Sequence, residues 1–136
     1  MLKHLHLNKF PSALETARSA DCQIRQLDAT SVEFAGPAIA YYEESPDGVV
    51  VHAAVPVNIE RGAEHPFDVV DLPTIQAATL VHRGSMDEVL PDWQALGRWV
   101  DENGYRSNGS AREVTLEYTP DPAGWVTELQ IPVRAS

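Results

Sequence analysis

The sequence has few of the residues that would give it a covalent framework or a basic surface. It contains one cysteine, Cys22, among 136 residues, so an internal disulfide is excluded. Lys and Arg number 10 against 20 Asp and Glu, which gives a formal net charge of −10. Such a chain repels phosphate backbones, and it shows no helix-turn-helix, zinc-finger pattern or basic stripe. We therefore expect no direct binding to nucleic acid.

Long apolar runs are also absent. No stretch approaches the roughly 18 apolar residues that a membrane-spanning helix needs. The segment MLKHLHLNKF lacks the apolar block of a secretory signal. We therefore expect no membrane partner and a cytoplasmic location. The hydrophobic fraction of 43% is ordinary, so residues 1–136 are predicted to form one domain with its own core.

Motifs for metal or cofactor chemistry are missing as well. The chain has no G-x-S-x-G elbow and no glycine-rich phosphate loop. His4 and His6 alternate with leucines, but no third ligand follows at a useful spacing. We expect no cofactor and no metal site.

The chain does contain two similar halves. The stretch WVTELQIPV resembles VVVHAAVPV, and each ends in a hydrophobic residue followed by Pro-Val. When the two are aligned on these prolines, Glu128 falls on His52. Upstream, GPAIAYYEESPDG parallels GSAREVTLEYTPDPAG, and both contain Pro, Asp and Gly in turn positions. Each half is therefore predicted to contain a β-hairpin.

The second half shows clear signals for a strand and a helix before its hairpin. Segment 74–82 is rich in β-formers, and Ser85 and Glu88 have the spacing of a capping box. Pro91 suits the first position of a helix, and Gly104 suits its C-terminal stop. One apolar helix face would be formed by Trp93, Leu96, Trp99 and Val100.

The first half follows the same plan less completely. Segment 12–34 is helix-compatible, which leaves only the short stretch LKHLHL as a first strand. We predict an α+β fold of two βαββ units related by a pseudo-twofold axis, in repeats spanning about 1–58 and 68–134. The first unit is predicted to lack a full first strand. The sheet faces turned away from the helices would line a central ligand cleft.

These faces carry the candidate site residues. They are predicted to include Tyr42 and His52 in the first unit, and Glu113, Thr115, Glu117 and Glu128 in the second. A carboxylate in a partly apolar cleft needs a partner, which His52, a tyrosine hydroxyl or a cationic ligand would provide. Tyr42, Tyr105 and Trp125 offer flat faces to aromatic or cationic molecules. The simpler alternative makes Glu113, Glu117 and Glu128 exposed strand residues, His52 a structural histidine, and Trp93 and Trp99 core residues.

A family resemblance rests on several segments in order. They are VVDLPTIQAATLVHRGSMDEVLPDWQALGRWVDENGY, REVTLEYTPDPAGWVTELQIPV, and upstream GPAIAYYEE and VHAAVPV. Together they resemble the GyrI-like domain, also called the effector-binding domain of bacterial transcription regulators. The resemblance covers about residues 36–133. It implies two βαββ units around a cleft for lipophilic, often cationic, aromatic molecules, with a glutamate at the base where this sequence has Glu128.

Three functions remain open. The favoured one is multidrug or effector binding in a regulatory or drug-sequestering role. Its ligand-binding residues would be Glu128, Tyr42, His52, Glu117, Tyr105, Trp125 and Trp93. The first alternative, suggested by the family, is hydrolysis of reactive strained-ring electrophiles, with Glu128, Glu117 and His52 as catalytic residues. The second alternative is an acidic interaction module with a regulatory protein partner, such as a gyrase inhibitor.

Overall fold

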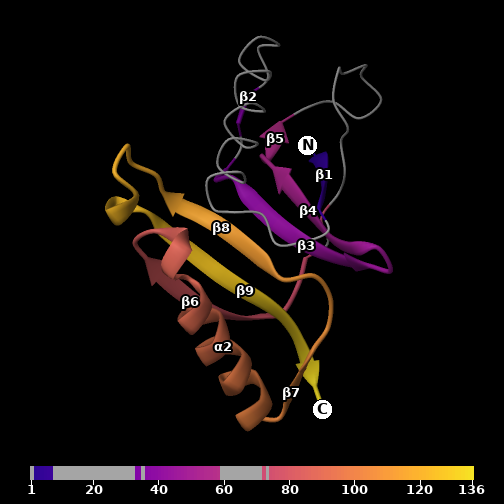
Figure 1. Ribbon diagram of the computed structural model, residues 1–136. Coiled ribbons are helices and arrows are strands. Elements are labelled where there is room, and N and C mark those ends of the chain that lie inside the picture. The colour runs from indigo at the N-terminus through magenta and orange to yellow at the C-terminus, as the bar shows by residue number, and fades with distance from the viewer. Residues whose placement is uncertain (1, 8–32, 35, 59–71, 73) are drawn as a thin grey trace. The chain divides into compact units, whose positions relative to one another are not determined.

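The computed structural model describes residues 2–7, 33–34, 36–58, 72 and 74–136 (Figure 1). The chain divides into two compact units, Met1–Leu72 and Pro73–Ser136. Strands and a helix combine in an α+β fold, as predicted. Within the described ranges, no helix has the length and apolar character to cross a membrane. The pseudo-twofold relation and the cleft between the repeats stay predictions.

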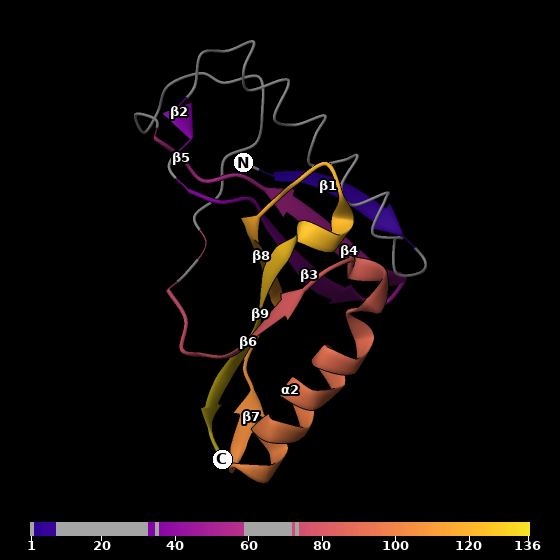
Figure 2. The same ribbon diagram turned by 90° about the vertical axis from the view of Figure 1, so that its left-hand side faces the viewer.

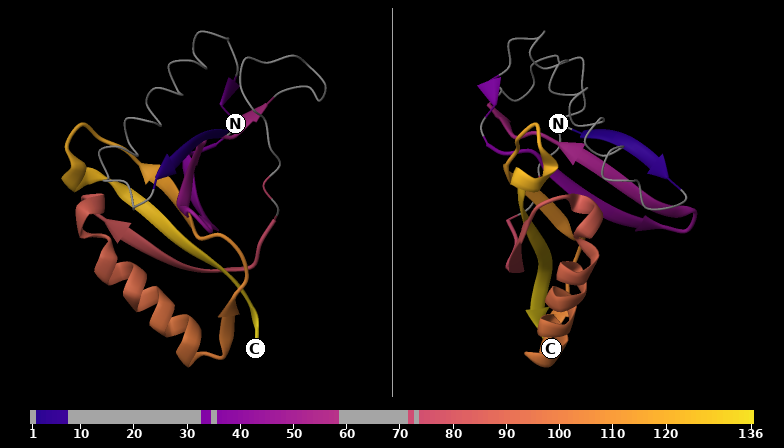
Figure 3. Two further views of the ribbon diagram at one scale, coloured as in Figure 1. Left: turned by 45° about the vertical axis from the view of Figure 1, so that its right-hand side comes forward. Right: turned by 60° about the vertical axis from the view of Figure 1, so that its left-hand side comes forward.

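The first unit contains three antiparallel strands in the order β1-β4-β3 (Figure 3). Their bounds are β1 Leu2–Leu7, β3 Ile39–Ser45 and β4 Gly48–Ala54. A separate two-stranded ribbon pairs β2, Glu33–Phe34, with β5, Val57–Asn58. Strand β2 occupies the end of the segment predicted as a helix, and residues 12–32 of that segment lie outside the described residues.

The first strand of the first unit is the short stretch LKHLHL, as the sequence predicts. Every residue of β1 has a Cα partner on β4, from Leu2 opposite Ala54 to Leu7 opposite Val49. Its six residues compare with seven in β6 of the second unit. LKHLHL is short in sequence, but β4 offers it pairing groups along its whole length.

The predicted β-hairpin of the first unit is also confirmed. Ser45 pairs with Gly48, so only Pro46 and Asp47 connect β3 to β4. Gly48 has a φ of 137°, a conformation that residues with a Cβ rarely adopt. Proline, aspartate and glycine therefore close this hairpin as their backbone preferences require.

The second unit has the predicted order of strand, helix, strand and strand, with one short strand added. Its elements are β6 (Ala77–Arg83), a 3₁₀ turn η1 (Met86–Glu88), α2 (Leu90–Glu102), β7 (Tyr105–Ser107), β8 (Arg112–Glu117), a 3₁₀ turn η2 (Pro122–Gly124) and β9 (Val126–Ala135). Strand β9 lies between β6 and β8, and its C-terminal end pairs with β7. Figure 2 shows α2 beside this sheet, where it contacts β6, β7 and β9.

The helix begins and ends where the sequence predicts. The Ser85 hydroxyl accepts a hydrogen bond from the Asp87 amide at 3.2 Å and caps η1, after which α2 starts with Pro91 in its first turn. Its buried residues, Leu96 and Val100, pack on the sheet. The sheet side of this core consists of Ala78, Leu129 and Val133, with Leu80 and Ile131 at its edge.

Trp99 is not a core residue, so its prediction as one is wrong. It lies on the helix, and its side chain is 48% exposed. Its ring stacks on Tyr105, with centroids 5.8 Å apart and planes 13° apart. The buried residues of α2 are Leu96 and Val100, so its buried stripe is narrower than the predicted face.

Two glycines of this segment give opposite expected results on substitution by alanine. Gly97 lies inside α2, and a Cβ added there would meet no atom within 4 Å. Gly97→Ala should therefore raise the free energy of unfolding by about 0.5–1 kcal/mol, because alanine loses less conformational freedom in a helix. Gly104, just after the helix, has a φ of 74°. Gly104→Ala should lower stability by about 1 kcal/mol or more, because alanine is strained at that φ. Urea unfolding of the two variants measures the difference, and equal signs would contradict it.

Candidate functional site

The central strand β9 presents two different faces. Leu129 is completely buried and Thr127 is 5% exposed on the face that α2 covers. Glu128 points to the opposite face and is partly buried. Its Cα partners are Val81 on β6 and Val114 on β8, so one carboxylate stands between two valines in the middle of the sheet. The register assigns to this face Thr79, Val81, Arg83, Arg112, Val114, Glu117, Val126, Glu128 and Gln130.

Glu128 is held in place by its neighbour on the same strand face. The Gln130 side-chain amide donates a hydrogen bond of 2.7 Å from Nε2 to Oε1 of Glu128. Residues two apart on a strand point to the same side, which makes this contact possible without bending the backbone. The carboxylate of Glu128 is therefore oriented by a neutral partner.

A β-bulge in β8 determines on which face of the sheet three predicted site residues lie. Glu113 pairs with Leu129 and Thr115 with Thr127, so both lie on the face that α2 covers. The register then shifts between Thr115 and Glu117, and Glu117 pairs with Val126 on the face of Glu128. The prediction that Glu113 and Thr115 share the face of Glu128 is wrong. Glu117 does share that face and is exposed.

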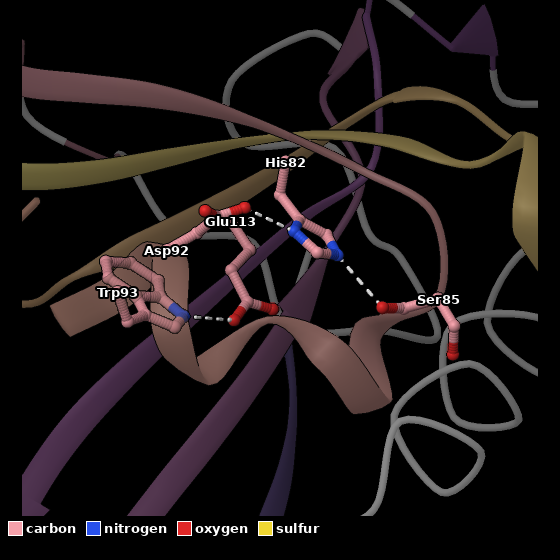
Figure 4. Close-up of polar contacts among 5 residues, drawn as sticks. All are labelled: His82, Ser85, Asp92, Trp93 and Glu113. Atoms are coloured by element: carbon pink, nitrogen blue, oxygen red, sulfur yellow. Dashed lines mark hydrogen bonds and ion pairs between the residues drawn. The ribbon is translucent and has the colours of Figure 1, made fainter. Parts of the chain in front are cut away.

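Glu113 is a buried carboxylate beneath the helix rather than an exposed strand residue. Its side chain is 9% exposed, and Oε1 accepts a hydrogen bond of 3.2 Å from Nε1 of Trp93 (Figure 4). Trp93 also packs at the edge of the hydrophobic core. It therefore links α2 to β8, and the structure places it on the helix side, away from Glu128.

His82, a residue that the sequence analysis did not single out, joins the end of β6 to the start of α2. Its Nδ1 lies 2.6 Å from Oδ2 of Asp92, and its Nε2 lies 2.9 Å from the carbonyl oxygen of Ser85 (Figure 4). Both neighbours accept hydrogen bonds, whereas a neutral imidazole has only one N–H group. The doubly protonated ring satisfies both contacts.

The surroundings of His82 favour this charged form. Burial alone lowers the pKa of His82. The hydrogen bonds to Asp92 and Ser85, together with the charges of Asp92 and Glu88, outweigh burial and raise the pKa above its ordinary value of 6.5. Because both ring nitrogens are engaged, His82 is a structural clamp and not a free general base. In the sequence, this clamp is marked only by a histidine near the end of β6 and an acidic residue in the first turn of α2.

In the first unit, Tyr42 and His52 lie on opposite faces of the hairpin. His52 pairs with Tyr41, and Tyr42 pairs with Val51. The ring of His52 stacks on Tyr41 with centroids 4.5 Å apart, and its Nε2 contacts Oε2 of Glu43 at 2.9 Å. The prediction that Tyr42 and His52 share a face is wrong, because the two-residue turn sets the register one residue away from the expected one.

The remaining predicted aromatic residues lie at two separate places in the second unit. Tyr105 packs against the core on the helix side. Trp125 stacks on Tyr118 at 5.3 Å, and its Nε1 donates a hydrogen bond of 2.8 Å to the carbonyl oxygen of Thr119. The structure thus joins Glu128 with Glu117 on one face and does not bring Tyr105 or Trp93 to it.

The second unit is thus a sheet with α2 on one face and the partly buried carboxylate of Glu128 on the other. The sequence matches the GyrI-like family, described as a GyrI-like small molecule binding domain, over residues 14–134. This match covers most of the chain, and the protein belongs to that family. A search of curated proteins finds no match to the sequence.

Solved structures show the same fold. The EcmrR chain in the EcmrR–DNA complex of EcmrR-RPo aligns with a TM-score of 0.80 and 21% identity. That alignment covers 100% of this chain and 57% of the EcmrR chain. The EcmrR C-terminal domain aligns with a TM-score of 0.78 and 24% identity, covering 99% of this chain and 90% of that one. SAV2435 bound to tetraphenylphosphonium aligns with a TM-score of 0.66 and 10% identity, covering 98% and 86%.

Proposed function

We propose that this domain captures lipophilic, cationic aromatic molecules and that Glu128 supplies the countercharge, in a regulatory or drug-sequestering role. The observation that carries the proposal is the position of Glu128. It projects from the central strand β9 between Val81 and Val114, on the face that α2 leaves open. The valines provide apolar contact for a ring, and the carboxylate provides attraction for a positive charge.

Two further observations support a cationic ligand. The chain has a formal net charge of −10, which raises the local concentration of cations near its surface. A structure of the same fold, SAV2435, is bound to tetraphenylphosphonium, a lipophilic aromatic cation. The regulatory role is supported by the likeness to the EcmrR C-terminal domain and to EcmrR in complex with DNA.

Within the described residues, neither alternative function gains a specific observation. His52 contacts Glu43 through Nε2, and its ring stacks on Tyr41. Glu117 shares the face of Glu128 but is exposed. Binding is therefore the function that the geometry supports best.

Glu128→Gln tests the proposal, because it removes the charge and nearly preserves the shape. Titration of the protein with tetraphenylphosphonium should show a dissociation constant about tenfold larger for the variant, which corresponds to about 1.4 kcal/mol. The matched control is Glu102→Gln, which removes one carboxylate from the exposed end of α2. The control should bind like the wild type. Equal weakening by both variants would mean that net charge, and not Glu128, attracts the cation.

A further inference from the structure

The contact between Gln130 and Glu128 suggests what kind of cation the site prefers. This inference rests on the proposed function. The Gln130 amide donates one N–H group to Oε1 of Glu128. An ionised carboxylate only accepts hydrogen bonds, and a glutamine side chain has one acceptor oxygen and two N–H donors. After this hydrogen bond forms, the two side chains still have more acceptor oxygens than N–H donors.

The acceptors that remain are Oε2 of Glu128 and Oε1 of Gln130. The hydrogen bond between the two side chains uses neither of these oxygens. Both side chains project from the same strand on the same face, two residues apart, and both are partly buried. A ligand that covers this face removes water from both oxygens at once.

We propose that Glu128 and Gln130 together select cations that carry N–H donors over cations that carry none. A protonated amine gives N–H groups to both oxygens and neutralises the carboxylate. A quaternary ammonium or phosphonium cation neutralises the carboxylate but leaves the Gln130 oxygen without a donor. A buried acceptor without a partner weakens binding, because it has lost its hydrogen bond to water. Gln130 is thus a specificity-determining residue, whereas Glu128 attracts cations of both kinds.

A matched pair of cations isolates this effect. The probes are 1-naphthylmethylammonium and its N,N,N-trimethyl counterpart, which share the aromatic ring and the charge and differ in N–H groups. The three methyl groups add apolar area, which by itself favours binding of the trimethyl probe. The readout is therefore the ratio of the two dissociation constants, compared between wild type and variants.

Gln130→Met is the decisive variant, because methionine has a similar length and no hydrogen-bonding amide. The preference for the primary ammonium, expressed as this ratio, should fall about tenfold in Gln130→Met. Gln130→Glu keeps acceptor oxygens at the position and should retain the preference. Thr79→Ala is the control, because Thr79 is an exposed Cα partner of Gln130 on the same face and carries no amide. Its ratio should equal that of the wild type.

The outcomes separate this inference from the proposed function. An unchanged ratio in Gln130→Met, with both cations weakened by Glu128→Gln, overturns the selection by Gln130 and leaves the proposed function standing. Failure of the wild type to bind either cation, or binding that is indifferent to Glu128→Gln, overturns the proposed function and this inference with it. A tenfold fall in Gln130→Met with no change in Thr79→Ala supports both.

Discussion

Leu129→Ala should lower the free energy of unfolding by about 3 kcal/mol. Leu129 is completely buried, and it lies at the centre of the core formed by Ala78, Leu96, Val100 and Val133. Truncation removes three carbon atoms from the side chain and leaves a cavity between β9 and α2, which partial relaxation does not fill. Urea unfolding followed by tryptophan fluorescence measures the change.

The matched control for Leu129→Ala is Leu116→Ala. Leu116 lies in the β8 bulge and is 47% exposed, so its truncation should cost less than about 1 kcal/mol. Leu129 also faces away from Glu128, so the folded Leu129→Ala protein should bind tetraphenylphosphonium with nearly the affinity of the wild type. Similar losses of stability in the two variants would contradict the assigned core.

His82→Gln should lower the free energy of unfolding by about 2 kcal/mol at pH 5.5, and by less as the pH rises. Burial disfavours the charge of His82, but the hydrogen bonds to Asp92 and Ser85 outweigh it and raise the pKa above 6.5 in the folded state. A group with a raised pKa gives its full stabilisation below its unfolded pKa and loses it as pH rises through the folded pKa. The loss at low pH reflects broken charge-assisted hydrogen bonds, which are worth about 1.5–3 kcal/mol. Thermal or urea unfolding between pH 5.5 and 9 measures it.

Asp92→Asn provides a second test of the His82 clamp from its other side. Its free energy of unfolding should also lie below that of the wild type, and this deficit should become smaller as the pH rises above about 6.5. Glu102→Gln lies on the same helix but outside the clamp. Its difference in free energy of unfolding from the wild type should stay constant over this pH range. A His82→Gln effect that is constant from pH 5.5 to 9 would show that folding does not shift the pKa of His82, and it would contradict the clamp.

Local sequence signals predicted the elements of the second unit well. Ser85, Pro91 and Gly104 act over a few residues, and they mark the turn, the start and the end of α2 as expected. The alternation along 125–133 placed Leu129 and Glu128 on opposite faces of β9. Short-range backbone preferences and burial decide these features, so one sequence is enough to infer them.

The partners of the site residues were harder to predict, because they depend on register. A shift of one residue moves every side chain of a strand to the other face. The turn in the first unit paired His52 with Tyr41 instead of Tyr42. The His82–Asp92 contact joins residues ten positions apart in different elements, and no periodic pattern marks it. The apolar face of the helix is narrower than the sequence predicted, because Trp99 stacks on Tyr105 at the surface.

The bulge in β8 also determines how this strand would tolerate a change in length. Leu116 is the extra residue between Thr115 and Glu117, so its deletion would leave a regular ladder with Glu117 still opposite Val126. Deletion of Val114 would have a different effect on the pairing. If the residues after it keep their pairing, Glu113 moves into the vacated place opposite Glu128, and two like charges face each other across neighbouring strands. Insertions and deletions in relatives of this sheet should therefore gather at the bulge and avoid the three residues before it.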